Sequence, residues 1–211
     1  VCSSDLISAV ISMAKSDDEV LVRVESGGGV VHGYGLGASQ LQRLRDKGLF
    51  LTVSIDKVAA SGGYMMACVA QKIIAAPFAI VGSIGVVAQM PNFNRLLKKH
   101  DVDIELHTAG QFKRTLTIFG ENDDKAREKF KAELETVHQQ FKQFVSEHRP
   151  RMDIDQIATG EHWLAAEAKK LGLVDELKTS DDYLLSQFEN KQVIKVAYRN
   201  KKGLADRFSN A

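Results

Sequence analysis

The chain has 211 residues, of which 44% are hydrophobic and 26% charged, values typical of a globular protein with one sizeable core. A formal net charge of +1 excludes a strong electrostatic preference for nucleic acid or for an acidic membrane surface. Of the two cysteines, Cys2 and Cys68, the second lies in an apolar segment, so we expect a buried free thiol there and neither a disulfide nor a metal ligand.

The ends of the chain suggest a fragment. The sequence begins at Val1 without a methionine or a signal peptide, and its longest apolar run, residues 75–88, is shorter than the roughly 20 residues of a membrane-spanning helix. We therefore expect a piece of a longer protein, in which residues 1–199 form one domain and residues 200–211 a disordered polar tail.

The hydrophobic pattern predicts helices and strands that alternate along the chain. In order, we expect a helix at 6–14, strands at 20–24 and 49–55, a helix at 37–47 between them, a helix at 64–70, a strand at 72–76, a short helix near 93–97, a strand at 102–107, a long helix at 123–149, a helix at 165–170, a short strand at 173–175, a helix at 181–188 and a last strand at 193–198. This order predicts an α/β fold with a largely parallel sheet. The short strand, glycine-turn and helix units favour a spiral of ββα units with a long C-terminal helix.

The segment around Ser61 is the first candidate site. It reads Val58-Ala59-Ala60-Ser61-Gly62-Gly63-Tyr64, between a predicted strand and a predicted helix. A small hydroxyl residue at such a turn suits a nucleophile, and the amide of Gly62 would face the same space at the positive end of the helix dipole, where an oxyanion is stabilised. The alternative is a glycine-rich turn whose serine only caps the helix.

A second glycine-rich segment, Ser26-Gly27-Gly28-Gly29, follows the strand at 20–24. Glycines permit backbone conformations closed to other residues and let a substrate approach the main chain. No Gly-Lys-Ser/Thr follows, which excludes a phosphate-binding loop. The segment is either a flexible turn or a strand end that supplies an oxyanion hole.

Two further residues are ambiguous on their own. Ser83 lies in the apolar run 80–87, where most serines are simply buried and bonded to backbone. Lys113 follows Gly110-Gln111-Phe112 in a predicted loop, where a lysine is usually a solvated surface charge.

Taken together, these motifs resemble one family. Glu25-Ser26-Gly27-Gly28-Gly29, Ala60-Ser61-Gly62-Gly63-Tyr64, Val81-Gly82-Ser83-Ile84-Gly85, Gly110-Gln111-Phe112-Lys113 and the segment from Trp163 through Ala168 to Gly172-Leu173-Val174-Asp175 are similar, in that order, to the signal peptide peptidase (protease IV) family of serine proteases. The resemblance covers residues 20–198. It departs where many members have Ser-Pro-Gly-Gly and this chain has Ser26-Gly27-Gly28-Gly29, which leaves the role of Gly28 less secure than that of Ser61.

The resemblance implies a Clp-protease/crotonase fold and a Ser–Lys catalytic dyad. Ser61 would be the nucleophile, Lys113 the general base, Ser83 a hydrogen-bond partner of the lysine, and Gly28 and Gly62 the amide donors of the oxyanion hole. A free lysine, with a pKa of about 10.4, is a poor base at neutral pH, so the lysine would need a desolvated site. No metal and no cofactor would take part.

The resemblance also implies a setting. The chain would be the peptidase catalytic domain of a membrane-anchored protein at the bacterial inner membrane, on the periplasmic side. It would cleave peptides, signal-peptide remnants or unfolded proteins through an acyl-enzyme, and it would assemble into homo-oligomers.

Three alternatives remain open. A crotonase-type acyl-CoA hydratase or isomerase shares the fold and the two-glycine oxyanion hole but needs carboxylates there and has no use for Ser61 or Lys113. A non-catalytic scaffold could keep the same fold. A Ser–His–Asp triad would use His32 or His107, and triads are recognised by geometry that a sequence does not show.

Overall fold

The computed structural model describes residues 3–197 and shows an α/β fold with two sheets. The first is fully parallel, with strands in the order β1 (Glu19–Arg23), β2 (Phe50–Ile55), β4 (Lys72–Ala75) and β7 (Glu176–Leu177). The second has the order β3 (Val58–Ala60), β5 (Ile80–Gly82) and β6 (His162–Leu164), with β3 and β5 parallel and β6 antiparallel to β5. The predicted parallel α/β architecture is therefore confirmed.

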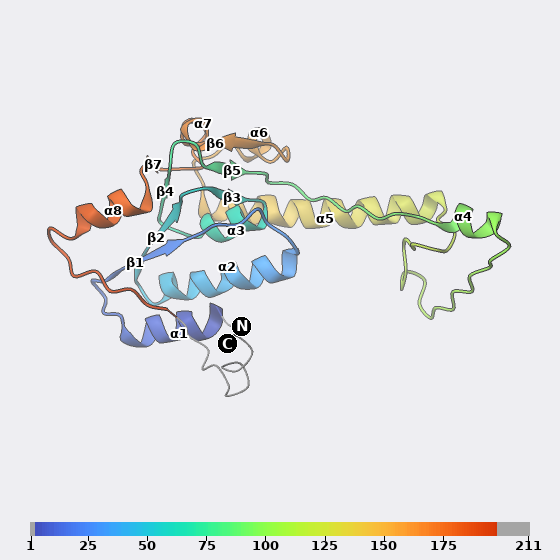
Figure 1. Cartoon of the computed structure of the whole chain (residues 1–211), viewed down its shortest axis with the longest axis horizontal. Helices are drawn as coiled ribbons and strands as arrows, with labels where there is room; N and C mark the ends of the chain where they lie inside the picture. The colour runs from blue at the N-terminus through green and yellow to red at the C-terminus, as the bar shows by residue number, and fades with distance from the viewer. Residues whose placement is uncertain (1–2, 198–211) are drawn as a thin grey trace, which may run out of the picture.

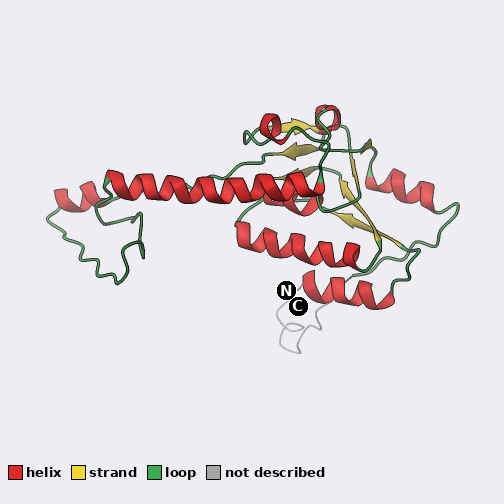
Figure 2. Cartoon of the chain, turned by 180° about the vertical axis from the view of Figure 1, so that it is seen from behind, coloured by secondary structure: helices red, strands yellow, loops and turns green. Residues whose placement is uncertain are grey.

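The helices surround these sheets (Figures 1 and 2). They are α1 (Ser3–Met13), α2 (Val31–Asp46), α3 (Gly62–Ala67), α4 (Asn94–Lys99), α5 (Asp124–His148), α6 (Ile154–Ile157), α7 (Ala165–Lys170) and α8 (Ser180–Gln187). In β2, residues pointing to both faces are buried, including the polar Thr52 and Ser54. Burial on both faces is typical of a central parallel strand, and it places the ends of β2 and β3 inside the body of the protein.

Helix α5 extends far beyond this body (Figure 1). At its first turn the Asp123 side chain accepts a hydrogen bond from the amide of Ala126, as in a standard N-cap. Its fully buried residues, Phe141 and Val145, lie in the C-terminal half. The N-terminal half of α5 projects from the body, with α4 and the loop of residues 100–123 at its far end. We call these three parts together the arm. No helix within residues 3–197 is both long enough and apolar enough to span a bilayer.

The base of the arm is held by a partly exposed ion pair. Just after α5, Arg149 bonds Asp175 at 2.6 Å and the carbonyl of Gly172 at 2.8 Å. Asp175 in turn accepts the amide of Ile73 in β4 at 2.7 Å. Because this pair connects α5 to the central sheet, the direction in which the arm leaves the body is fixed.

Two predicted strands are wrong. Residues 102–107 are exposed loop, and residues 193–197 are also without strand structure, while residue 198 lies outside the described part of the chain. Both segments alternate apolar and polar residues, but a strand also needs a neighbour to bond its backbone, and neither segment has one among residues 3–197. The predicted polar tail, residues 200–211, lies outside the described residues.

Other differences concern element boundaries. Helix α2 begins at Val31 and so includes three glycines that suggested a later start, and β7 lies just after the expected 173–175. The short elements β3, β5, β6 and α6 were not expected as separate elements. Three- and four-residue elements carry too little periodicity to be read from sequence.

Glu19 supports a prediction about stability. Its carboxylate accepts hydrogen bonds from Thr52 (2.6 Å), Tyr183 (2.5 Å) and Lys191 (2.8 Å), and so connects β1, β2 and α8. Burial alone would raise the pKa of Glu19, but these hydrogen bonds outweigh it and lower the pKa below its ordinary 4.5. The resulting stabilisation is present above about pH 4.5 and is lost as the pH falls through the lowered pKa.

We therefore expect Glu19→Gln to lower the free energy of unfolding by about 2 kcal/mol at pH 7, as for hydrogen bonds to a charged group. Urea unfolding at pH 7 and at pH 3 measures this, and the difference from wild type should shrink at pH 3. Glu133→Gln, on the surface of α5, is the control and should cost less than about 0.5 kcal/mol. A Glu19→Gln variant as stable as wild type at pH 7 would contradict the assignment.

Candidate active site

Ser61 lies at the sharp turn between β3 and α3. Its backbone has φ 51° and ψ −120°, a conformation that residues other than glycine rarely adopt and that costs about 1–3 kcal/mol. Its amide is fixed by a 2.8 Å bond to the carbonyl of Gly82. A strained strand-to-helix turn of this kind presents the nucleophilic serine in α/β-hydrolases, so the local structure fits a nucleophile better than it fits a helix cap. The Ser61 side chain makes no capping hydrogen bond to α3.

The glycine-rich segment lies directly against Ser61. Gly28 has φ 95°, and a Cβ added there would lie 2.7 Å from Ser61 Cβ and 3.0 Å from the amide nitrogen of Gly62. Any side chain at position 28 would collide with the turn. The structure thus brings together Ser61, Gly28 and Gly62, as predicted. The Gly28 amide donates a long, 3.2 Å hydrogen bond to Ser26 Oγ in this arrangement.

The two glycines after Ser61 also have no room for a side chain. A Cβ at Gly62 would lie 2.3 Å from the Tyr34 ring, and one at Gly63 would lie 2.4 Å from the carbonyl oxygen of Ser26. Tyr34, on α2, is a site residue that the sequence reasoning missed. Its signal was weak: it lies one turn before the buried Ala38 on the same face of α2, but glycines on both sides hid the helix.

Ser83 directly follows the strand that pairs with the strand before Ser61. The register of β3 with β5 ends with Ala60 opposite Gly82, and Ser61 and Ser83 are the next residues along the chain after this pair. Ser83 also has a positive φ, 53°, and its amide donates to the carbonyl of Glu161 at 2.6 Å. Two serines with strained backbones therefore come directly after neighbouring parallel strands.

Lys113 is not brought to this site within one copy of the chain. It is exposed in the loop of residues 100–123, at the far end of the arm (Figure 1). Its neighbour Phe112 stacks on the side chain of Lys129, with Nζ 5.3 Å from the ring centroid. Phe141, which shares the core with α3, lies three turns further along α5, roughly 18 Å at 1.5 Å per residue. The predicted nucleophile and base are thus well separated in the single chain.

The two histidines of the triad alternative are not placed as partners of Ser61. His32 is exposed on the first turn of α2. His107 is in the arm loop, and its ring bonds Glu105 at 3.3 Å. Cys68 is a buried free thiol whose pKa is raised by burial, as expected from its apolar surroundings. Cys2 lies outside the described residues.

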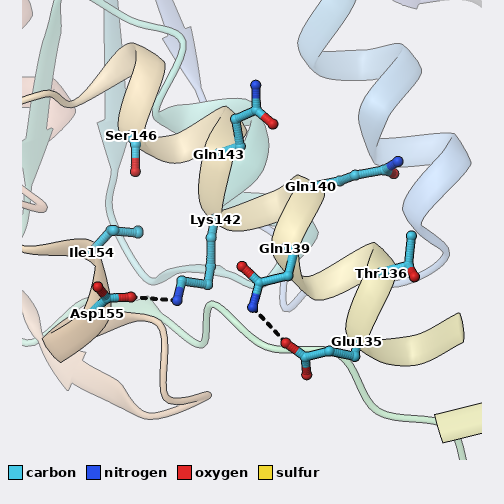
Figure 3. A pocket seen from close by; sticks show the side chains of 9 residues that line it. All are labelled: Glu135, Thr136, Gln139, Gln140, Lys142, Gln143, Ser146, Ile154 and Asp155. Carbon is cyan, nitrogen blue, oxygen red and sulfur yellow. Dashed lines mark hydrogen bonds and ion pairs between the residues drawn. The ribbon is translucent and has the colours of Figure 1, made fainter. Parts of the chain in front are cut away.

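A groove of about 580 Å³ runs along α5 and α6 (Figure 3), and none of the predicted site residues lines it. Its polar side chains bond one another: Lys142 points to Asp155 at 2.5 Å, and Gln139 to Glu135 at 2.6 Å. Because these groups already have partners, we interpret the groove as a solvated helix surface and place the candidate site at Ser61.

Known proteins match this chain over most of its length. Residues 43–194 match the model of peptidase family S49, and residues 4–41 match the N-terminal model of the same family. The chain is 63% identical to "Probable protease SohB" of Haemophilus influenzae over 202 residues, which are 96% of this chain and 57% of the relative. It is 57% identical to the protein of the same name from Buchnera aphidicola subsp. Acyrthosiphon pisum over 203 residues, 96% of this chain and 60% of the relative. The chain thus spans somewhat over half the length of these relatives. With a family model that covers most of its length and relatives at this identity, the chain belongs to peptidase family S49.

Proposed function

We propose that this chain is the catalytic domain of a serine endopeptidase in which Ser61 attacks the peptide carbonyl. The observation that carries the proposal is the close contact of the Gly28 segment with Ser61 and Gly62. Backbone amides on two sides of a strained serine can bind the oxyanion of a tetrahedral intermediate. Peptidase family membership supports a hydrolytic use of this geometry.

We further propose that Lys113 of a neighbouring copy is the general base. Ser61 has no basic partner among the described residues of its own chain, and Lys113 is carried outward on the arm. If the arm of one copy packs against the body of a second copy, Lys113 of the first copy would lie beside Ser61 and Ser83 of the second. The interface would exclude water from this lysine. Desolvation favours the neutral amine that a base requires.

The proposed reaction uses one proton carrier. The neutral Lys113 amine takes the Ser61 hydroxyl proton as the oxygen bonds to the peptide carbonyl carbon, and it then passes this proton to the departing amine as the peptide bond breaks. Water, deprotonated by the same lysine, next attacks the acyl-enzyme carbonyl; the lysine returns this proton to Ser61 Oγ as the ester bond breaks and the carboxylate product is released. Ser83 would accept or donate a hydrogen bond that holds the amine in place.

The surface of the arm supports assembly. Several of its apolar side chains are about half exposed, which is unusual for side chains gathered in one part of a monomer. They are Phe93, Leu96, Val102, Ile104, Leu106, Phe112, Ile118 and Phe119. Residues 102–107 also alternate like a strand while their backbone lacks a partner. A second copy of this chain would cover both features, so we propose a homo-oligomer.

The remaining proposals rest on the resemblance to the protease IV family. We propose the Clp-protease/crotonase spiral as the fold type, and the repeated passage from the first sheet to the second, from β2 to β3 and from β4 to β5, is compatible with it. We also propose that the whole protein acts at the bacterial inner membrane, with this domain on the periplasmic side, on peptides, signal-peptide remnants or unfolded proteins.

Incubation with denatured protein and with apolar peptides, followed by mass spectrometry of new termini, tests the function. Cleavage within the peptide chain is the expected result. Binding of an acyl-CoA without any cleavage would instead favour the crotonase-type enzyme, and neither binding nor cleavage by an assembled preparation would favour a scaffold.

Assembly gives a separate prediction. Leu106→Asp places a charge in the exposed apolar surface of the arm, and we expect it to shift the oligomer to smaller species and to lower activity at least tenfold, because each lost interface removes a lysine from a site. Sedimentation velocity at micromolar concentration measures the first effect. Leu185→Asp, at an equally exposed leucine on α8, is the control and should change neither. A monomeric wild-type chain that cleaves peptides efficiently would refute the need for assembly.

A further inference from the structure

Tyr34 closes a small ring of hydrogen bonds around the glycine-rich segment. Its hydroxyl donates to the carbonyl of Gly28 at 3.0 Å and lies 2.6 Å from Ser26 Oγ. Because a hydroxyl has one proton, Tyr34 must then accept the proton of Ser26. The amide of Gly28 donates to Ser26 Oγ at 3.2 Å and completes the ring, so this amide would exchange that long bond for one to the oxyanion during the reaction.

The aromatic ring of Tyr34 meets the other side of the site. It fills the space where a side chain of Gly62 would lie, within 2.3 Å of the added Cβ, and where one of Gly29 would lie, within 2.9 Å. A single side chain therefore touches both backbone segments that face Ser61. The distance between these two backbone segments therefore depends on the position of the Tyr34 side chain.

Such a support is needed here. Three glycines in a row give the segment 27–29 a wide choice of backbone conformations, whereas an oxyanion hole works only if its donors are held in place before the reaction. We propose that Tyr34 is a positioning residue that fixes the Gly28 segment relative to Gly62, and so sets the geometry of the oxyanion hole. This inference rests on the proposed serine peptidase function.

Removal of the hydroxyl alone tests the inference. In the full, assembled protein, Tyr34→Phe keeps the ring against Gly62 but opens the hydrogen-bonded ring. We expect kcat to fall roughly tenfold or more, short of the 10²–10³ loss seen when an oxyanion donor is removed, with KM within about twofold of wild type. The affinity for a peptide aldehyde, whose adduct with Ser61 places an oxygen in the hole, should fall by the same factor as kcat/KM.

Tyr183→Phe is the matched control. Tyr183 also donates a partly buried hydrogen bond, to Glu19 at the start of β1, so its loss changes stability without removing a contact of the glycine segment. We expect kcat and aldehyde affinity of Tyr183→Phe to stay within twofold of wild type at a temperature where both variants are folded.

A second substitution separates positioning from other roles. Gly27 has open space around an added Cβ and no positive φ, and Ser26 before it pairs with Ala59 as an extended bridge, so we expect position 27 to accept proline. Proline stiffens the segment independently of Tyr34. We expect Gly27→Pro to restore kcat of Tyr34→Phe to within about threefold of Gly27→Pro alone. A substrate-contact role of the hydroxyl would leave no such rescue and would overturn the inference.

Hydrogen exchange of residues 27–29 gives a readout that does not require turnover. These amides should exchange about tenfold faster in Tyr34→Phe than in wild type and Tyr183→Phe. Unchanged hydrogen exchange, kcat and aldehyde affinity in Tyr34→Phe would overturn the inference about Tyr34. The proposed function would still stand in that case, provided that peptidase activity depends on Ser61. Activity that survives Ser61→Ala would overturn the function, and the exchange rates would still decide whether Tyr34 orders the segment.

Discussion

Ser61→Ala is expected to reduce peptidase activity at least a thousandfold and to leave the fold intact. Only the nucleophilic oxygen is lost, and removal of a residue that acts in covalent catalysis costs several orders of magnitude. Serine and alanine share the Cβ that makes φ 51° costly, so the strain of the turn is unchanged. The measurement is kcat/KM on a fluorogenic peptide, together with thermal unfolding followed by circular dichroism.

Ser83→Ala is the control for this prediction. It removes the same hydroxyl from the neighbouring strand end, at a residue with an almost identical φ of 53°. Because Ser83 would orient the amine without transferring the proton, we expect a loss of roughly tenfold, as for one hydrogen bond. More than a thousandth of wild-type activity in Ser61→Ala would count against Ser61 as the nucleophile.

The second large effect is expected at Lys113. Both Lys113→Ala and Lys113→Arg should remove activity nearly as fully as Ser61→Ala. Arginine keeps the positive charge but is not deprotonated in proteins, so it cannot accept the serine proton. Lys99→Arg, at another exposed lysine of the arm, is the matched control and should retain full activity. Peptide hydrolysis and sedimentation are measured together, so that loss of the base is distinguished from loss of assembly.

The same assays distinguish lysine from histidine as the base. The double variant His32→Ala/His107→Ala should keep most of the activity, and kcat/KM should rise toward alkaline pH rather than show a limb near about pH 6.5, the range of histidine. An active Lys113→Arg enzyme that is inactivated by the histidine substitutions would refute the Ser–Lys dyad and restore the triad.

The local structure around Ser61 could be predicted from the sequence because it depends on neighbours in the chain. An apolar strand, an Ala-Ser-Gly-Gly turn and a following helix form one contiguous pattern. The contact with Gly28 lies next to the bridge between Ser26 and Ala59, and from the sequence it was expected only through the family resemblance. The long helix α5 was equally clear from its apolar stripe and from Pro150, which follows its end.

The position of Lys113 relative to Ser61 could not be predicted in this way. The order of motifs says which residues belong to a site but gives no distance between them, and α5 carries the lysine loop away from the body. The strand expected at 102–107 is absent for a related reason. Alternating apolar and polar residues indicate that a segment could form a strand with one apolar face, but a strand forms only where another backbone pairs with it.

Tyr34 shows a third limit. Gly33 and Gly35 have low helix propensity, and the helix was expected only from residue 37, yet α2 forms from Val31 because Tyr34, Ala38 and Leu41 pack on one side. Only the folded structure shows that this packing places the Tyr34 hydroxyl against Gly28.

The most direct test of the account mixes two inactive variants. Ser61→Ala copies keep Lys113, and Lys113→Ala copies keep Ser61. If the lysine comes from a neighbouring copy, dissociation and reassembly of a 1:1 mixture should recover about a quarter of wild-type activity, because one in four neighbour combinations pairs an intact serine with an intact lysine. A reassembled mixture that remains as inactive as the two separate variants would contradict a dyad shared between copies.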